Sequence, residues 1–108
     1  MPDRGDVVWL AFSPRTGHEQ SGRRPAVVLS PASYNGRVGL ALACPVTRQA
    51  RGYPFEVELP SALEVEGVVL ADRVRCLDWR AREAEFIGRA PEFVMKEIVG
   101  KVEALLTG

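Results

Sequence analysis

Residues 23–29 read Arg-Arg-Pro-Ala-Val-Val-Leu, a pair of basic residues followed by a short apolar run. β-branched residues are typical of strands, and a proline fits at a strand start, where its missing N–H is not needed. The run therefore predicts a strand over Pro25–Leu29. A similar run, Asp6–Phe12, stops at Ser13-Pro14 and predicts a preceding strand. The polar residues between them, Ser13–Gly22, predict a long loop that leads directly into the two arginines.

Further short runs of strand type follow along the chain. Phe55–Leu59 is the clearest, because its three apolar residues alternate with two glutamates. The other predicted strands are Val38–Cys44, Gly67–Ala71, Val74–Leu77 and Arg82–Gly88. In the first of these, Leu40, Leu42 and Cys44 would share one face and Ala41 and Ala43 the other. Ser30–Gly36 is expected to connect two strands, with room for a helical turn, and Val46–Pro54 forms a second polar loop.

The last segment changes to helical periodicity. Pro91 suits the first helical position and Glu92 the first turn. Apolar residues then recur at helical spacing and predict a wide buried face of Val94, Met95, Ile98, Val99, Val102, Leu105 and Leu106. Six or seven short strands and one such helix predict a mainly β fold, a small SH3-like barrel with a C-terminal α-helix. Strand patterning alone does not separate this barrel from an OB-fold.

The bulk properties predict one domain over residues 1–108. No apolar run approaches the ~20 residues of a membrane helix, and the first residues lack the features of a secretory signal, so a cytoplasmic protein is expected. The two cysteines, Cys44 and Cys76, are expected to be reduced. We expect no metal site, because His18 is the single histidine and no metal-ligand spacing occurs.

The net charge is zero, but the charges are unevenly placed. Segments Ser13–Arg24 and Pro45–Pro54 together hold five arginines (15, 23, 24, 48 and 51) against a single acid, Glu19. If these two loops meet in space, they form a basic patch suited to a polyanion. The alternative is that the arginines are scattered and merely solvated.

These loops contain the side chains that cleavage of RNA requires. RNA carries its own nucleophile, the 2′-OH, so an enzyme must hold the phosphate, move protons and stabilise the charge of the transition state. Arginine donors suit the phosphate, and a hydroxyl such as Thr47 can donate to a non-bridging oxygen. Glu19 or His18 could accept a proton, although a lone histidine in a polar loop is more often a solvated surface residue. None of these steps requires a metal or another cofactor.

Several motifs in order resemble the MazF/PemK toxin family. They are Gly5-Asp6-Val7-Val8-Trp9, Gly22–Pro31, Pro45-Val46-Thr47, Gly52–Val57, Leu70-Ala71-Asp72-Arg73-Val74 and Trp79-Arg80-Ala81-Arg82. The resemblance covers nearly the whole chain. It implies an SH3-like barrel, a homodimer and sequence-specific cleavage of single-stranded RNA to 2′,3′-cyclic phosphate and 5′-OH ends. It also implies a cognate MazE-like antitoxin whose disordered acidic tail occupies the RNA groove.

The resemblance also assigns roles to residues. Arg24 and Thr47 match the catalytic arginine and threonine of the family, and Glu19 matches a glutamate implicated in some members. The residues expected to bind RNA are Gln20, Arg23, Arg48, Gln49, Arg51, Asp72, Arg73 and Arg82. Because the pKa of an arginine exceeds ~12, we expect Arg24 to stabilise the phosphate rather than act as the sole base. The alternatives are an anchoring role for Arg24, a turn role for Thr47, and for Glu19 a role as partner of a neighbouring arginine.

The sequence departs from close relatives at Ala11, Ser13, Arg48 and Arg73, so the preferred RNA sequence need not carry over. A non-enzymatic alternative is a gyrase-inhibiting toxin of the same fold, as in the CcdB relatives. The decisive features of that inhibitor lie on its C-terminal helix, typically with a terminal tryptophan. Here the chain ends in Leu105-Leu106-Thr107-Gly108, which favours the ribonuclease.

Overall fold

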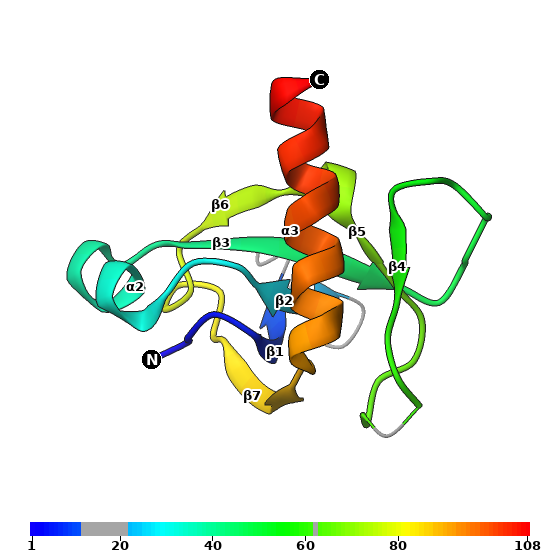
Figure 1. Ribbon diagram of the computed structural model, residues 1–108. Coiled ribbons are helices and arrows are strands. Elements are labelled where there is room, and N and C mark those ends of the chain that lie inside the picture. The colour runs from blue at the N-terminus through cyan, green and yellow to red at the C-terminus, as the bar shows by residue number, and fades with distance from the viewer. Residues whose placement is uncertain (12–21, 62) are drawn as a thin grey trace.

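The computed structural model describes residues 1–11, 22–61 and 63–108. Within these residues the chain forms seven strands, a short helix, a 3₁₀ turn and a long C-terminal helix (Figure 1). The strands are β1 (Asp6–Ala11), β2 (Arg23–Val28), β3 (Ala41–Thr47), β4 (Glu56–Glu58), β5 (Val68–Leu70), β6 (Arg75–Leu77) and β7 (Glu85–Arg89). The helices are α2 (Ala32–Val38) and α3 (Glu92–Thr107), and the 3₁₀ turn is η1 (Ala71–Arg73). The predicted mainly β fold with a C-terminal helix is confirmed.

β3 organises the sheet, because it pairs with three other strands. All pairings are antiparallel, and the strands follow the order β4-β5-β3-β2-β1-β7. One edge of β3 pairs with β2. Its other edge pairs first with β6, at Ala41–Ala43, and then with β5, at Val46 and Thr47. The turn η1 lies between β5 and β6 and connects the two strands that share this edge of β3.

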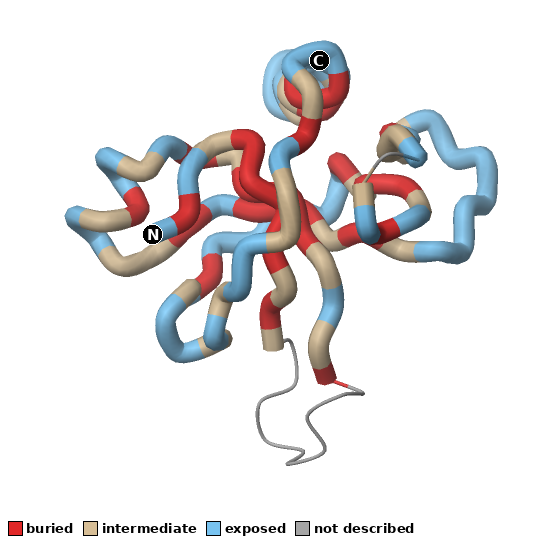
Figure 2. Tube along the Cα trace, turned by 90° about the horizontal axis from the view of Figure 1, so that it is seen from below, coloured by how far each residue is buried: buried red, intermediate tan, exposed pale blue. Residues whose placement is uncertain are grey.

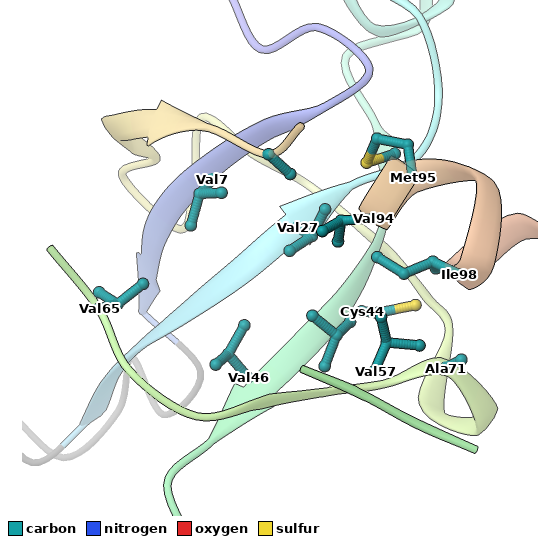
Figure 3. Close-up of a cluster of buried hydrophobic side chains, with 12 residues drawn as sticks. Val7, Val27, Cys44, Val46, Val57, Val65, Ala71, Val94, Met95 and Ile98 are labelled. Carbon is teal, nitrogen blue, oxygen red and sulfur yellow. The ribbon is translucent and has the colours of Figure 1, made fainter. Parts of the chain in front are cut away.

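The main core lies between α3 and one face of the sheet. Val94, Met95 and Ile98 of α3 are buried against strand residues such as Val27 and Cys44 (Figure 3). Seen end-on, α3 lies over the centre of the sheet, where buried residues concentrate (Figure 2). A second cluster, built around Val8, Leu10, Ala26, Val28, Ala41, Ala43 and Leu77, is packed against Trp79. Burial of both clusters is the main favourable contribution to folding.

Several predicted boundaries were wrong. The strand expected over Val38–Cys44 starts at Ala41, because α2 continues to Val38 and ends at Gly39, whose φ of 83° suits glycine. The strand then continues to Thr47, so the predicted loop starts later. Ala41 and Ala43 lie on one face, as the alternation predicted, and both are buried, while Leu42 on the other face is 39% exposed.

The other shifts are at the C-terminal end. The last strand begins at Glu85 rather than Arg82, because the Asp78 carboxylate accepts hydrogen bonds from the backbone of Arg80 and Ala81 and closes a turn. Pro91 precedes the helix instead of being its first residue. The predicted apolar face of the helix is buried only in its first half. Leu105 and Leu106 are exposed, since the last turns of α3 extend beyond the sheet (Figure 1).

A buried polar network joins the N-terminus to α2 and β3. The Asn35 side chain is fully buried, and its amide donates to the carbonyls of Pro2 and Ser30, both at 2.9 Å. The Ser30 hydroxyl donates to Asn35 Oδ1 and accepts from the backbone N–H of Leu42. The Trp79 indole N–H donates to the backbone carbonyl of Asn35. Asn35 and Ser30 together therefore join four segments: the N-terminus, the residues from 30 to 35, β3 and the turn at Trp79.

Candidate active site

Arg24 and Thr47 are brought together by the pairing of β2 with β3. In this antiparallel register, Ala26 lies opposite Pro45 and Val27 opposite Cys44. Two residues beyond Ala26, the same register brings Arg24 to Thr47, near the start of β2 and at the end of β3. The two predicted catalytic residues, 23 positions apart in sequence, are thus neighbours in the sheet.

Two pockets open on this part of the sheet, and both are lined by Arg24, Val46 and Thr47. The larger has a volume of about 340 Å³ and the smaller about 200 Å³. Val46 and Val65 lie at the end of the main core that is farthest from α3 (Figure 3). Arg24 and Thr47 therefore lie between two adjoining pockets.

The two pockets differ in charge. Among the residues that the structure describes, the charged residues lining the smaller pocket are all basic, namely Arg24, Arg73 and Arg75. The larger pocket balances Arg24 and Arg48 against Glu64 and Glu66, over a floor that includes Trp9 and Val65. Within the described parts of the chain, no carboxylate forms an ion pair with Arg24, Arg48 or Arg73. These guanidinium groups remain available to an anion.

Thr47 is held both by its backbone and by its side chain. It pairs with Val68 of β5, and its hydroxyl accepts a hydrogen bond of 3.1 Å from the backbone N–H of Gln49. Gly67, with a φ of 130°, packs directly on the Thr47 carbonyl. A Cβ at Gly67 would lie against that carbonyl oxygen and 3.2 Å from the Cα of Arg48. The position of Thr47 therefore depends on the absence of a side chain at residue 67.

Two of the predicted RNA-binding arginines are engaged elsewhere. Arg23 forms an ion pair of 2.7 Å with Glu85, and its guanidinium lies 5.9 Å from the centroid of the Trp9 ring. Arg82 is half-buried and donates to the Ala11 carbonyl at 2.9 Å, while its own carbonyl accepts from the Ala11 N–H. These contacts hold the end of β1 and the start of β2. Neither arginine lines the two pockets.

The remaining predicted residues lie nearby or outside the described chain. Gln49, Arg51 and Asp72 are exposed and are not among the residues that line the two pockets. The loop of Arg51 is closed by Glu56, whose carboxylate accepts from the backbone N–H groups of residues 51 and 52. Glu19 and Gln20, with the weighed alternative His18, are outside the described residues.

Four lining residues were missed by sequence reasoning. They are Trp9, Arg75, Glu64 and Glu66, none of which the sequence patterns predict as a site residue. The pattern Glu64-Val65-Glu66, with an apolar residue between two acids, does indicate that both carboxylates share one side of an extended segment. The pattern does not indicate which surface of the fold the two carboxylates face.

The buried thiol is unsuited to be a nucleophile. Burial, together with a smaller effect of the nearby Asp72 carboxylate, raises the pKa of Cys44 to about 12. The thiolate, which is the reactive form, is therefore scarce at neutral pH. The described residues also contain no group of three or more histidine, cysteine, aspartate or glutamate side chains able to hold a metal ion.

Comparison with known proteins identifies the family. Residues 3–106 match the family model described as PemK-like, MazF-like toxin of type II toxin-antitoxin system. This chain belongs to that toxin family. The resemblance stated from the motifs is confirmed, and Arg24 and Thr47 are neighbours in the fold of a family member.

Individual relatives agree with the assignment over their full length. The chain is 47% identical over 106 residues to the endoribonuclease toxin MazF of Escherichia coli strain K12, covering 98% of this chain and 95% of that protein. It is 40% identical over 109 residues to the endoribonuclease toxin ChpB of the same strain, covering 96% and 93%.

Solved structures show the same fold. A crystal structure of MazF (Form-I) from Deinococcus radiodurans superimposes with a TM-score of 0.89 at 61% identity, covering 99% of this chain and 97% of that one. A crystal structure of MazE–MazF (Form-III) from the same organism superimposes with a TM-score of 0.90 at 59% identity, covering 97% and 95%. The barrel of the MazF toxins, rather than an OB-fold, is therefore the architecture of this PemK/MazF-family chain.

Proposed function

We propose that this chain is a sequence-specific endoribonuclease toxin that cleaves single-stranded mRNA. The observation that carries the proposal is the shared position of Arg24 and Thr47 between two pockets, one of them lined by three arginines. The names of the relatives, endoribonuclease toxins MazF and ChpB, support the same activity. They also favour it over inhibition of a topoisomerase by binding alone.

The reaction uses the 2′-OH of the substrate as nucleophile. A bond forms between the 2′-oxygen and phosphorus, and the bond from phosphorus to the 5′-oxygen breaks. The products are a 2′,3′-cyclic phosphate and a 5′-OH. Arg24 donates to the non-bridging oxygens, and its positive charge stabilises the additional negative charge of the transition state. The Thr47 hydroxyl donates a second hydrogen bond to the same phosphate.

Proton transfer completes the reaction. The 2′-OH must lose a proton as it attacks, and the 5′-oxygen must gain one as it leaves. We assign the first task to the Glu19 carboxylate, and the second to the Arg24 guanidinium, which takes a proton back from solvent. None of these steps uses a metal ion. Arg73 and Arg75, on the wall of the smaller pocket, hold the phosphate from the other side.

The wider RNA surface consists of the other predicted binding residues. Arg48 lines the larger pocket, and exposed Gln49, Arg51 and Asp72 lie on adjoining loops, where they can contact flanking nucleotides. Gln20 is assigned the same role. For Arg23 and Arg82 the contacts with Glu85 and Ala11 support a positioning role at the ends of β1 and β2.

The protein partners follow from the family. We infer that a cognate MazE-like antitoxin neutralises the toxin, with an acidic segment occupying the arginine-lined pocket, because a relative of known structure was solved as MazE–MazF. We further infer a homodimer, which offers a way to cover exposed apolar side chains such as Phe86, Phe93 and Leu106. No helix among the described residues is long and apolar enough to span a membrane. With mRNA as substrate, the site of action is the cytoplasm.

One experiment tests the activity. The purified chain is incubated with a long single-stranded RNA in EDTA, and the 5′ ends of the products are mapped. We expect cuts at a defined sequence, loss of these cuts in Arg24→Ala, and retention in Arg37→Ala, which removes an exposed arginine from α2. Absence of cleavage by folded wild-type protein would refute the ribonuclease proposal. Cleavage that required magnesium would refute the mechanism given above.

A further inference from the structure

The larger pocket differs from a phosphate site in charge and in lining. Its lining contains two carboxylates, Glu64 and Glu66, as well as Arg24 and Arg48, so the formal charges of the described lining residues cancel. A phosphate entering here would meet repulsion from both carboxylates. The adjoining smaller pocket, where the charged lining residues within the described chain are all arginines, offers the same phosphate a better position. The two pockets therefore suit two different parts of a nucleotide chain.

The lining of the larger pocket suits a nucleobase. Its volume of about 340 Å³ is within the range of small-molecule pockets, and Trp9, Val46 and Val65 give it an apolar side. Carboxylates accept hydrogen bonds from the amino groups of bases, as in the contact of glutamate with cytosine N4. Neither Glu64 nor Glu66 takes part in an ion pair within the described residues, and both are exposed to an incoming ligand.

The carboxylate wall is held at a fixed place relative to Thr47. Gly67 follows Glu66 directly and packs on the Thr47 carbonyl, and its own carbonyl accepts from the Leu59 N–H. The side chains of Glu64 and Glu66 are thereby carried to the pocket that adjoins the catalytic pair. A base beside the scissile phosphate could therefore contact both carboxylates within the larger pocket.

We propose that Glu64 and Glu66 read the nucleobase next to the scissile phosphate and select bases that carry an amino group. This inference rests on the ribonuclease function proposed above. Adenine, cytosine and guanine each offer amino hydrogens to the two carboxylates. Uracil has no amino group, and its single N3–H donor lies between the O2 and O4 acceptors, which the carboxylates repel, so it is disfavoured at this one position.

The test compares wild type with Glu64→Gln, Glu66→Gln and the double variant. The substrates are short oligoribonucleotides that carry the preferred cleavage sequence, with all four bases in turn at each position flanking the cut. We expect wild type to disfavour uracil at one flanking position by about tenfold or more in kcat/KM. In the variants this discrimination falls towards unity, while preferences at the other positions are unchanged.

The matched control is Glu58→Gln, which removes the same charge from an exposed glutamate of neighbouring β4 that does not line either pocket. It should leave the profile as in wild type. A second control replaces the preferred base by its analogue without the amino group. Wild type should lose rate on this analogue, and the double variant should not.

Binding provides an independent readout. The 2′-O-methyl forms of the same oligoribonucleotides lack the nucleophile, so their affinities, measured by fluorescence anisotropy, report base preference without cleavage. An unchanged base profile in both glutamine variants, in binding and in cleavage, would overturn the inference while leaving the ribonuclease intact. A protein that showed the binding preference but cut none of the unmodified substrates would overturn the ribonuclease alone.

Discussion

Arg24 of β2 meets Thr47 of β3 two residues beyond the paired residues Ala26 and Pro45, and both side chains line the same two pockets. The strand pairing that builds the core of the domain thus also positions the proposed catalytic pair. Because Ala26 and Val27 are fully buried, the backbone on one side of the site is fixed by packing. A rigid support of this kind reduces the reorganisation that the transition state would otherwise require.

Arg24→Lys should lower kcat for RNA cleavage by about a hundredfold while leaving the fold intact. Lysine keeps the positive charge but lacks the planar fork of donors that can bind two phosphate oxygens at once. Steady-state kinetics on a fluorogenic oligoribonucleotide would measure the loss. Arg37→Lys, an exposed change on α2, is the matched control. Full activity of Arg24→Lys would show that charge alone suffices.

Thr47→Val and Thr47→Ser should separate the hydroxyl from the shape of the side chain. Valine removes the donor and should reduce kcat by about a hundredfold, with little change in KM, if the hydroxyl acts chiefly in the transition state. Serine keeps the hydroxyl and should retain activity within about tenfold. Valine also removes the acceptor for the Gln49 N–H, at a cost of about 1 kcal/mol in the free energy of unfolding. Equal kcat for both variants would exclude a role for the hydroxyl.

Gly67→Ala should impair cleavage more than Gly52→Ala does. Both glycines have positive φ, 130° and 79°, so each alanine introduces backbone strain of about 1 kcal/mol or more. At residue 67 the new Cβ meets the Thr47 carbonyl, whereas at residue 52 no described residue lies within 4 Å of it. Thermal unfolding would report the strain, and kcat the displacement of Thr47. Matching kcat values for the two variants would contradict the positioning role of Gly67.

Asn35→Ala should destabilise the domain by about 2–4 kcal/mol, because it removes three buried side-chain hydrogen bonds and leaves a cavity. For a domain of this size the melting temperature should fall by roughly 10 °C or more. Ser33→Ala, an exposed change on the same helix, should leave it nearly unchanged. Calorimetry on both variants measures the difference, and a shift of Asn35→Ala no larger than that of Ser33→Ala would contradict the network.

The two cysteines should differ in alkylation. Cys76 is exposed and should react with iodoacetamide at pH 8, whereas burial raises the pKa of Cys44 to about 12 and shields its sulfur. Because the pKa in the folded state lies above the ordinary value of 9.0, the neutral thiol contributes stability that is complete below pH 9 and is lost as pH rises towards 12. Mass spectrometry should find one label in native wild type and none in Cys76→Ser. Alkylation of Cys44 in the native protein would contradict this prediction.

The strands and the C-terminal helix were accessible from sequence because their signals are local. The alternation in Phe55–Leu59 and the helical spacing after Pro91 each depend on neighbouring residues alone. The start of β3 was not accessible in this way, since it depends on the left-handed conformation of Gly39. The exposure of Leu106 depends on where the sheet ends beneath α3, a property of the whole fold.

The site was predicted only in part, because some of its residues are placed by contacts between distant parts of the sequence. Arg24 and Thr47 were found through motifs, and the meeting of their two segments is confirmed by the pairing of β2 with β3. The ion pair of Arg23 with Glu85 joins residues 62 positions apart, and the hydrogen bond of Arg82 to Ala11 joins residues 71 apart. Such separations leave no trace in local sequence, so the engagement of these two arginines could not be predicted. The place of Glu64 in the lining of the larger pocket likewise depends on a contact between distant residues, the close approach of Gly67 to Thr47.

The triple pairing of β3 has a consequence for the safety of the cell that makes this toxin. The residues that line the pockets come from β1, β2, β3 and the residues from 64 to 75. A fragment without any one of these segments therefore lacks part of the lining. Closing contacts across such spans is slow and occurs late in folding. We therefore expect a nascent chain that has not yet reached residue 75 to lack RNA-cleaving activity. Toxicity begins only when most of the chain has been made and folded.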